Sequence, residues 1–164
     1  MTTSAAVESA LLDTNVLVYA LDQESPFHSA ARTLLLRAAD TAWQERLCVT
    51  PQVLAEFFAV VTNPRRVRSP RSPEEALRAL EQFIALPNLT VLAVPVDVVS
   101  RWVPLVRAHR LGASRVFDAQ LAATIVANGV RRIYTFDRAH FECFAELEVI
   151  TPQQAIASHD NPPP

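Results

Sequence analysis

The sequence predicts an α/β fold in which a central parallel sheet lies between two layers of helices, a three-layer α/β/α sandwich. Short runs with β-strand character alternate with longer segments of helical periodicity along most of the chain. No linker or internal repeat divides the 164 residues, and 50% of them are hydrophobic, which is enough for one sizeable core. Strands that alternate with helices form βαβ units and hence a parallel sheet. We expect a single domain over residues 10–156, with flexible ends at 1–9 and 157–164.

Five short runs are the expected strands of this sheet. Each lies between turn residues or segments of helical pattern, which limits it to a few residues. The five runs are residues 10–12, 47–49, 90–94, 132–135 and 148–150.

Helical patterns in the first half of the chain fill the intervals between these runs. A short helix is expected over residues 14–20. Residues 27–43 are rich in Ala and Leu and place apolar side chains on one face, which predicts a longer helix. Thr50 and Pro51 have the residue types of an N-cap and a first helical position, so a third helix is expected to run from there to residue 61.

Three further helices are expected in the middle and second half of the chain. Pro73 opens one that continues to residue 86. Asp97 is expected to cap another that runs to residue 109, with Pro104 as a kink within it. Asp118 is expected to open a helix that stops at Gly129, because glycine readily ends a helix.

Composition excludes several functional classes. Two glycines are too few for a glycine-rich phosphate loop or a dinucleotide-binding fingerprint. Cys48 and Cys143 do not have the spacing of a zinc site, and they fit a reduced, intracellular setting. No apolar stretch approaches the roughly 18–20 residues that a membrane span needs, and the N-terminus lacks the basic residues of a secretory signal. We therefore expect a soluble, cytoplasmic protein with no membrane association.

Four acidic residues lie within apolar sequence, where an unpaired carboxylate is costly. Asp13 follows a leucine pair, Glu56 interrupts a hydrophobic helix, and Asp118 lies between two apolar stretches. Asp137 ends the run Ile-Tyr-Thr-Phe. If the fold brings the four carboxylates together, a divalent cation is the least costly partner for them.

Three of these acids fall where an open parallel sheet binds its ligands, beyond the carboxyl ends of strands and at helix N-termini. Asp13 and Asp137 follow expected strands, and Asp118 begins an expected helix. The neighbouring polar side chains that could hold the acids or bound waters in place are Thr14, Asn15 and Thr135. A site of this kind binds Mg²⁺ or Mn²⁺, activates a water and clamps phosphate oxygens during an in-line displacement.

Each acid also has a plain structural explanation. Asp13 could cap the helix after the first strand, and Asp118 could complement a helix dipole. Glu56 could face solvent, and Asp137 could be a turn residue paired with Arg138. The histidines have no partner at motif spacing, and the scarcity of glycine argues against a serine nucleophile elbow.

One arginine cluster lies in an expected loop between two helices, where two prolines favour extended backbone. Its arginines could follow an RNA phosphate backbone, or they could be a solvated loop. The cluster consists of Arg65, Arg66, Arg68 and Arg71, and Arg115 is a second candidate for phosphate contact because it precedes Asp118 by one helical turn.

Taken together, these residues make the chain resemble the PIN-domain ribonucleases, and more narrowly the VapC-type toxins of bacterial type II toxin–antitoxin modules. The resemblance covers about residues 10–156. Its motifs are Leu-Asp-Thr-Asn at 12–15, Glu56 within Ala-Glu-Phe, Phe-Asp-Ala-Gln-Leu-Ala-Ala at 117–123 and Thr-Phe-Asp-Arg at 135–138.

The resemblance implies a PIN-like α/β/α sandwich and a site that binds Mg²⁺ or Mn²⁺ through Asp13, Glu56, Asp118 and Asp137. It implies hydrolysis of single-stranded or structured RNA, such as a tRNA or rRNA, to leave 3′-hydroxyl and 5′-phosphate ends. It further implies a homodimer and a cognate antitoxin whose C-terminal segment obstructs the site. Thr14, Asn15 and Thr135 match supporting polar positions of the family, whereas the arginine loop matches none of its catalytic motifs.

Two other functions remain open at this point. A phosphatase of the haloacid-dehalogenase type also uses an acid after a strand, but it needs a second aspartate two residues later, where this chain has Asn15. The absence of lysine counts further against that chemistry. The second alternative is a non-catalytic PIN-like module that binds RNA or a partner protein.

Overall fold

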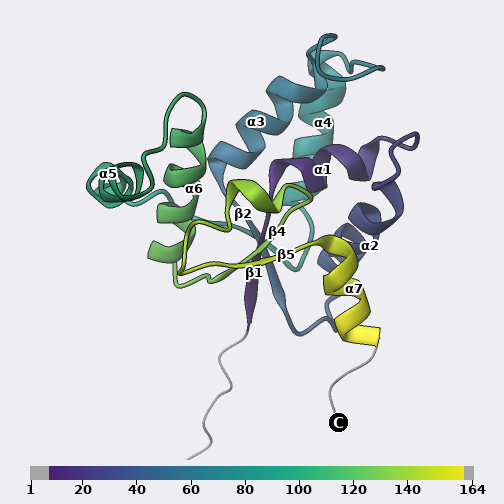
Figure 1. Cartoon of the computed structure of the whole chain (residues 1–164). Helices are drawn as coiled ribbons and strands as arrows, with labels where there is room; N and C mark the ends of the chain where they lie inside the picture. The colour runs from purple at the N-terminus through teal and green to yellow at the C-terminus, as the bar shows by residue number, and fades with distance from the viewer. Residues whose placement is uncertain (1–7, 161–164) are drawn as a thin grey trace, which may run out of the picture.

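A computed structural model of the chain describes residues 8–160 and contains a five-stranded parallel sheet (Figure 1). The order across the sheet is β3-β2-β1-β4-β5, and each neighbouring pair is parallel. The strands are β1 (Ser9–Leu12), β2 (Arg46–Val49), β3 (Leu89–Val91), β4 (Arg132–Tyr134) and β5 (Glu148–Ile150). The predicted α/β class is confirmed.

Helices cover both faces of the sheet. Figure 1 shows α5 (Val98–His109) and α6 (Arg115–Ala127) on one side, and α1 (Thr14–Leu21), α2 (His28–Ala39) and α7 (Pro152–Asp160) on the other. The helices α3 (Pro51–Val61) and α4 (Pro73–Ile84) project beyond the end of the sheet at which β1 finishes. No helix within residues 8–160 is long and apolar enough to cross a membrane.

The helix starts follow from local hydrogen bonds. The Thr50 hydroxyl accepts a hydrogen bond from the Val53 backbone N–H at 3.2 Å and caps α3. Ser72 and Glu75 form a reciprocal capping box at the start of α4. Both helices therefore begin where the sequence predicts, because polar side chains satisfy N–H groups that lack a partner within the helix.

The core consists of strand residues and the inward faces of the helices. Leu11, Leu12 and Ile133 are fully buried in the two central strands. A buried carboxylate, Glu45, also joins two strands: it accepts hydrogen bonds from the Tyr134 hydroxyl at 2.8 Å and from Arg132 at 2.9 Å. This network links the residue before β2 to β4. Because β1 and β4 pair in parallel, the residues that follow them meet at one edge of the sheet.

Several predicted boundaries in the middle of the chain were wrong. The helix expected to reach residue 43 ends at Ala39, because the Asp40 carboxylate accepts a hydrogen bond from the Ala42 N–H in a local turn. β3 ends at Val91, opposite the last residue of β2. The Leu92 backbone N–H still donates to the Val49 carbonyl at 2.8 Å, but residues 93 and 94 have no strand residue to pair with. Asp97 is the N-cap residue of α5, as predicted, but its side chain makes no capping hydrogen bond, because the carboxylate pairs with Arg101 at 2.9 Å.

The expected flexible ends were partly wrong as well. Ser9 already belongs to β1, and residues 157–160 belong to α7, which the sequence analysis did not predict. Thr151 and Gln154 exchange hydrogen bonds as a capping box before Pro152 and so start this helix. The remaining positions of the expected flexible ends, 1–7 and 161–164, lie outside the described residues.

Candidate active site

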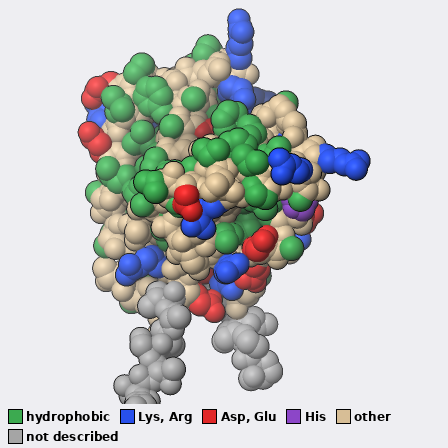
Figure 2. Space-filling view, turned by 90° about the vertical axis from the view of Figure 1, so that its left-hand side faces the viewer, with side chains coloured by type: hydrophobic (Ala, Val, Ile, Leu, Met, Phe, Trp, Pro, Cys, Tyr) green, Lys and Arg blue, Asp and Glu red, His purple; other side chains and the backbone are tan. Residues whose placement is uncertain are grey.

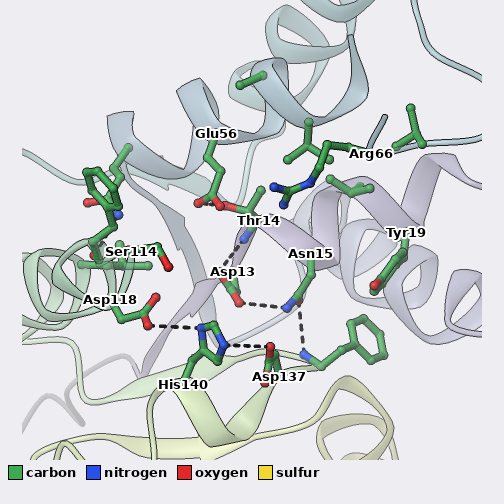
Figure 3. A pocket seen from close by; sticks show the side chains of 18 of the residues that line it. Asp13, Thr14, Asn15, Tyr19, Glu56, Arg66, Ser114, Asp118, Asp137 and His140 are labelled. Atoms are coloured by element: carbon green, nitrogen blue, oxygen red, sulfur yellow. Dashed lines mark hydrogen bonds and ion pairs between the residues drawn. The ribbon is translucent and has the colours of Figure 1, made fainter. Parts of the chain in front are cut away.

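The four predicted acids line one cavity of about 1050 Å³ at the carboxyl edge of the sheet (Figure 3). Asp13 follows β1 and is the N-cap residue of α1, and Glu56 lies in the middle of α3. Asp118 lies in the first turn of α6, which begins three residues earlier than predicted. Asp137 follows β4 and precedes a short 3-10 helix, η1 (Arg138–His140). Four separate segments of the chain thus each bring one carboxylate to this cavity.

Asp13 is buried and held by three hydrogen-bond donors. Its Oδ1 accepts from the Thr14 backbone N–H at 2.8 Å. Its Oδ2 accepts from the Thr135 hydroxyl at 2.6 Å and from the Asn15 side-chain amide at 3.0 Å. Burial raises the pKa of Asp13 from its ordinary 3.8 to about 6; the nearby Glu56 and Asp118 charges add to this rise, while the hydrogen bonds oppose it.

The three supporting polar residues all contact the acids. The Thr14 hydroxyl donates to Glu56 at 3.0 Å. The Thr135 hydroxyl oxygen accepts from the Asn15 amide at 3.1 Å and from the Asp137 backbone N–H at 3.0 Å. The Asn15 amide oxygen in turn accepts from the Phe136 backbone N–H at 3.2 Å. These contacts fix Asp13 and the backbone around Asp137 in one hydrogen-bonded unit.

Glu56 is exposed and yet lines the cavity. Its residue is exposed, as the solvent-facing alternative expected, and its side chain nevertheless points from α3 toward Thr14 across the cavity (Figure 3). The hydrogen bond from Thr14 gives the carboxylate a defined direction. Exposure to solvent and a place in the cavity are therefore compatible at this position.

A histidine that the sequence analysis did not select links the other two acids. His140 Nδ1 lies 3.2 Å from Asp118 Oδ2, and its Nε2 lies 3.3 Å from Asp137 Oδ2 (Figure 3). The expected absence of histidine partners was thus wrong for His140. Its spacing of three residues from Asp137, which places both on one side of a helical turn, was the available signal. Arg138, the alternative partner of Asp137, pairs instead with Glu142 at 2.8 Å.

The predicted arginines have different environments. Arg66 and Arg68 line the cavity with the acids. Arg71 donates to the Leu21 backbone carbonyl at 3.2 Å, which attaches the loop to the end of α1, and Arg65 is exposed. Arg115 contacts Asp118 at 2.7 Å and donates to the His140 carbonyl at 2.7 Å, so its guanidinium joins α6 to η1.

The donor atoms of the cavity suit a hard cation. Carboxylate and hydroxyl oxygens are the ligands that Mg²⁺ and Mn²⁺ prefer. Among residues 8–160, no three His, Cys, Asp or Glu side chains converge closely enough to surround a metal ion by themselves. Mg²⁺ keeps several waters and needs only one or two direct carboxylates. The residues present therefore fit a cation whose remaining ligands are water or substrate oxygens.

The sequence matches a known domain family and several known proteins over most of its length. The PIN domain family matches residues 10–147. Ribonuclease VapC24 of Mycobacterium tuberculosis is 30% identical over 141 residues, which cover 86% of this chain and 94% of VapC24. Ribonuclease VapC48 of the same organism is 28% identical over 144 residues, which cover 88% of this chain and 97% of VapC48.

Solved structures share the fold at lower sequence identity. The structure of VapBC2 from Rickettsia felis, bound to a DNA fragment from their promoter, superposes with a TM-score of 0.62 at 18% identity and covers 87% of this chain and 98% of that chain. VapC20 of Mycobacterium tuberculosis, a toxin that cleaves the sarcin–ricin loop, superposes with a TM-score of 0.60 at 20% identity and covers 82% of this chain and 95% of that chain. The chain therefore belongs to the PIN domain family and, within it, to the VapC ribonucleases.

Proposed function

We propose that this protein is a Mg²⁺- or Mn²⁺-dependent endoribonuclease and the toxin of a toxin–antitoxin pair. The observation that carries the proposal is the cavity in which Asp13, Glu56, Asp118 and Asp137 meet. Burial and neighbouring charges oppose the ionised form of Asp13, so a bound cation would offset a cost that the fold maintains at this position. The ribonuclease names of the relatives support the same activity.

Some residues of the cavity would bind the cation, and others orient the carboxylates that bind it. Asp13, Glu56, Asp118 and Asp137 would hold the cation, which supplies positive charge at the scissile phosphate and activates a water. Thr14, Asn15 and Thr135 fix the directions of the Asp13 and Glu56 oxygens. Arg115 and His140 fix Asp118 from its other side.

The reaction itself is an in-line displacement at phosphorus. The water oxygen forms a bond to phosphorus, a carboxylate of the cavity accepts the water proton, and the bond from phosphorus to the 3′-oxygen breaks. The departing oxygen takes up a proton and becomes a 3′-hydroxyl, which leaves a 5′-phosphate on the other fragment. Arg66 and Arg68 line the same cavity and would pair with flanking phosphates.

The phosphatase alternative does not fit the hydrogen bonds around Asn15. A phosphatase of the haloacid-dehalogenase type would need an acid at this position to exchange protons. The Asn15 amide instead donates to Asp13 and Thr135 and accepts from Phe136, so its donors and its acceptor are engaged. This residue serves to orient the acids.

The proposed partners are a cognate antitoxin and a second copy of the chain. Solved neighbours include toxin–antitoxin complexes from Rickettsia felis and Klebsiella pneumoniae, which supports an antitoxin partner. From the family resemblance, we expect the C-terminal segment of the antitoxin to cover the cavity. None of the residues of α5, all of which the structure describes, is buried; Val99 within the helix and Val96 just before it are exposed. Figure 2 shows apolar side chains gathered on this side of the molecule, which supports a homodimer across it. An RNA substrate and an antitoxin partner would both be met in the cytoplasm, which is the location that we propose.

A cleavage assay tests the proposal. Protein freed of antitoxin should cleave a structured RNA such as a tRNA in Mg²⁺ or Mn²⁺, and EDTA should stop the reaction. Asp118→Asn should abolish cleavage, whereas the matched variant Asp97→Asn, at the N-cap position of α5 and outside the cavity, should cleave like wild type. RNA binding without cleavage under any of these conditions would favour the non-catalytic alternative.

A further inference from the structure

An aromatic wall lies in the cavity beside the acids. It is formed by Tyr19 of α1, Phe27 before α2 and Phe136 before η1, and all three residues line the cavity. The ring centroids are 5.2 Å apart for Tyr19 and Phe27, 5.4 Å for Tyr19 and Phe136, and 4.6 Å for Phe27 and Phe136. The three rings, which are half-buried, form one apolar surface next to a charged site.

The Phe27 side chain does not cap the helix that it precedes. It is the N-cap residue of α2, a position at which Ser, Thr, Asp or Asn normally supplies a capping oxygen, and its side chain makes no capping hydrogen bond. Within residues 8–160, Tyr19 and Phe136 pack against the buried core, while Phe27 is not among the side chains that do so. Its ring therefore adds to the wall and not to the core.

A smaller cavity of about 270 Å³ extends from the wall and shares Tyr19, Phe27, Asp22 and Arg68 with the larger one. The Arg68 side chain is 92% exposed and lies 4.0 Å from Glu24, a distance and an exposure at which an ion pair is weak. Its guanidinium is consequently free to pair with an incoming phosphate. The carboxylates of Asp22 and Glu24 in the same cavity would repel a phosphate but could accept hydrogen bonds from the amino group of a base.

The wall is held at a fixed position relative to the acids. Asn15 donates to Asp13 at 3.0 Å through its amide nitrogen and accepts from the Phe136 backbone N–H at 3.2 Å through its oxygen. Phe136 also directly precedes Asp137. A group that stacks on the wall would therefore keep a constant distance from the reacting phosphate. Figure 3 shows Tyr19 beyond Asn15, on the opposite side of the cavity from Asp118.

We propose that the wall of Tyr19, Phe27 and Phe136 binds an unpaired nucleobase next to the scissile phosphate, while Arg68 pairs with the adjoining phosphate. The inference rests on the proposed ribonuclease function and adds the class of substrate: RNA in which at least one base at the cleavage site is unstacked from its neighbours. Proteins recognise unpaired bases by stacking them on aromatic side chains and by pairing arginine with the backbone. The wall and Arg68 supply both elements beside the acids.

The experiment measures base stacking separately from cleavage. A single-stranded RNA decamer with one 2-aminopurine is titrated with protein in EDTA, where metal-dependent hydrolysis does not proceed, and quenching of its fluorescence reports stacking. Phe27→Leu should reduce the quenching and weaken RNA binding on the order of tenfold. Phe27→Tyr, which keeps a ring, should bind like wild type. Phe58→Leu removes a half-buried ring of α3 that packs against the core and does not line the cavity, so it should leave binding and quenching unchanged.

Cleavage in Mn²⁺ gives the second readout. Since base binding acts equally on the ground state and the transition state, Phe27→Leu should raise KM and leave kcat nearly unchanged. Removal of the stacked base by an abasic site should weaken binding to wild type and have little effect on Phe27→Leu, because the two changes delete the same contact. Thermal melts establish that each variant folds, and Tyr19→Leu provides a second test of the same wall.

Three outcomes would overturn the inference, and they can be told apart. If wild type cleaves RNA and both wall variants bind and cleave as it does, only the base site is wrong. If the variants keep RNA binding but lose a co-expressed antitoxin, the wall is a protein-docking surface. If wild type neither binds nor cleaves RNA, the proposed function fails together with the base site.

Discussion

Changing the pH of the metal-free protein should change its free energy of unfolding through Asp13. The pKa of this buried carboxyl is raised from 3.8 to about 6, first by burial and then by the charges of Glu56 and Asp118. The folded state therefore binds a proton at Asp13 more tightly than the unfolded state does. The resulting stabilisation is fully present below about pH 4 and is lost as the pH rises through about 6.

The magnitude follows from the difference between the two pKa values. The rise from 3.8 to about 6 is worth about 3 kcal/mol at roughly 1.4 kcal/mol per pKa unit. Typical domains have free energies of unfolding of roughly 5–15 kcal/mol, so a loss of this size is measurable. Asp13→Asn removes the titrating group, and the stability of that variant should lack this component.

Urea unfolding in EDTA at several pH values between 4 and 7 provides the assay. The stability of Asp13→Asn minus that of wild type should increase by about 2.5 kcal/mol across this range, because a small part of the effect is already lost at pH 4. The side-chain amide introduced by Asp13→Asn cannot accept all three hydrogen bonds that the Asp13 carboxylate accepts. That loss lowers the stability of the variant by the same amount at every pH, so it does not change the pH dependence. Asp137→Asn, at a side chain that is 55% exposed in the same cavity, is the matched control and should track wild type within about 0.5 kcal/mol. Parallel pH curves for wild type and Asp13→Asn would refute the reasoning.

Two further predictions concern the charge of Asp118 and the arginine loop. Asp118→Asn should destabilise the protein by about 1–2 kcal/mol in EDTA, because it weakens the 2.7 Å contact with Arg115; thermal melts that show a more stable variant would mean that repulsion among the acids dominates. Arg66→Gln should weaken RNA binding and reduce the steepness of log binding constant against log salt concentration by roughly 0.7. Arg71→Gln should reduce the free energy of unfolding and leave that slope unchanged, because Arg71 holds the loop to Leu21. Equal salt slopes for wild type and Arg66→Gln would assign Arg66 to a solvated loop.

The fold class and the identity of the four site acids could be predicted because both depend on patterns of a few neighbouring residues. Each strand is a short apolar run, and a carboxylate such as Asp13 or Glu56 is conspicuous within apolar sequence. The capping residues Thr50 and Ser72 mark helix starts by the same local logic. The start of α7 had such a signature too, in Thr151 and the residues after it, and it was overlooked.

The remaining features of the site depend on contacts between distant segments. His140 contacts Asp118, which lies 22 residues earlier in the chain, and no helical or strand periodicity predicts a contact over that separation. Tyr19, Phe27 and Phe136 become a wall only when the end of α1 meets the segment after β4. The roles of Arg71 and Arg115 differ from those of Arg66 for the same reason, since a backbone carbonyl or a carboxylate engages their guanidinium groups.

The most direct test of the central claim is a comparison of two Mn²⁺ titrations, one of thermal stability and one of RNA cleavage. If the four carboxylates bind the catalytic cation, the melting temperature and the cleavage rate should rise with the same apparent Kd, since a ligand of the folded state stabilises it by mass action. Asp118→Asn should weaken both responses together. Cleavage that persists in EDTA, or a wild-type melting temperature that Mn²⁺ does not change while cleavage proceeds, would contradict the account.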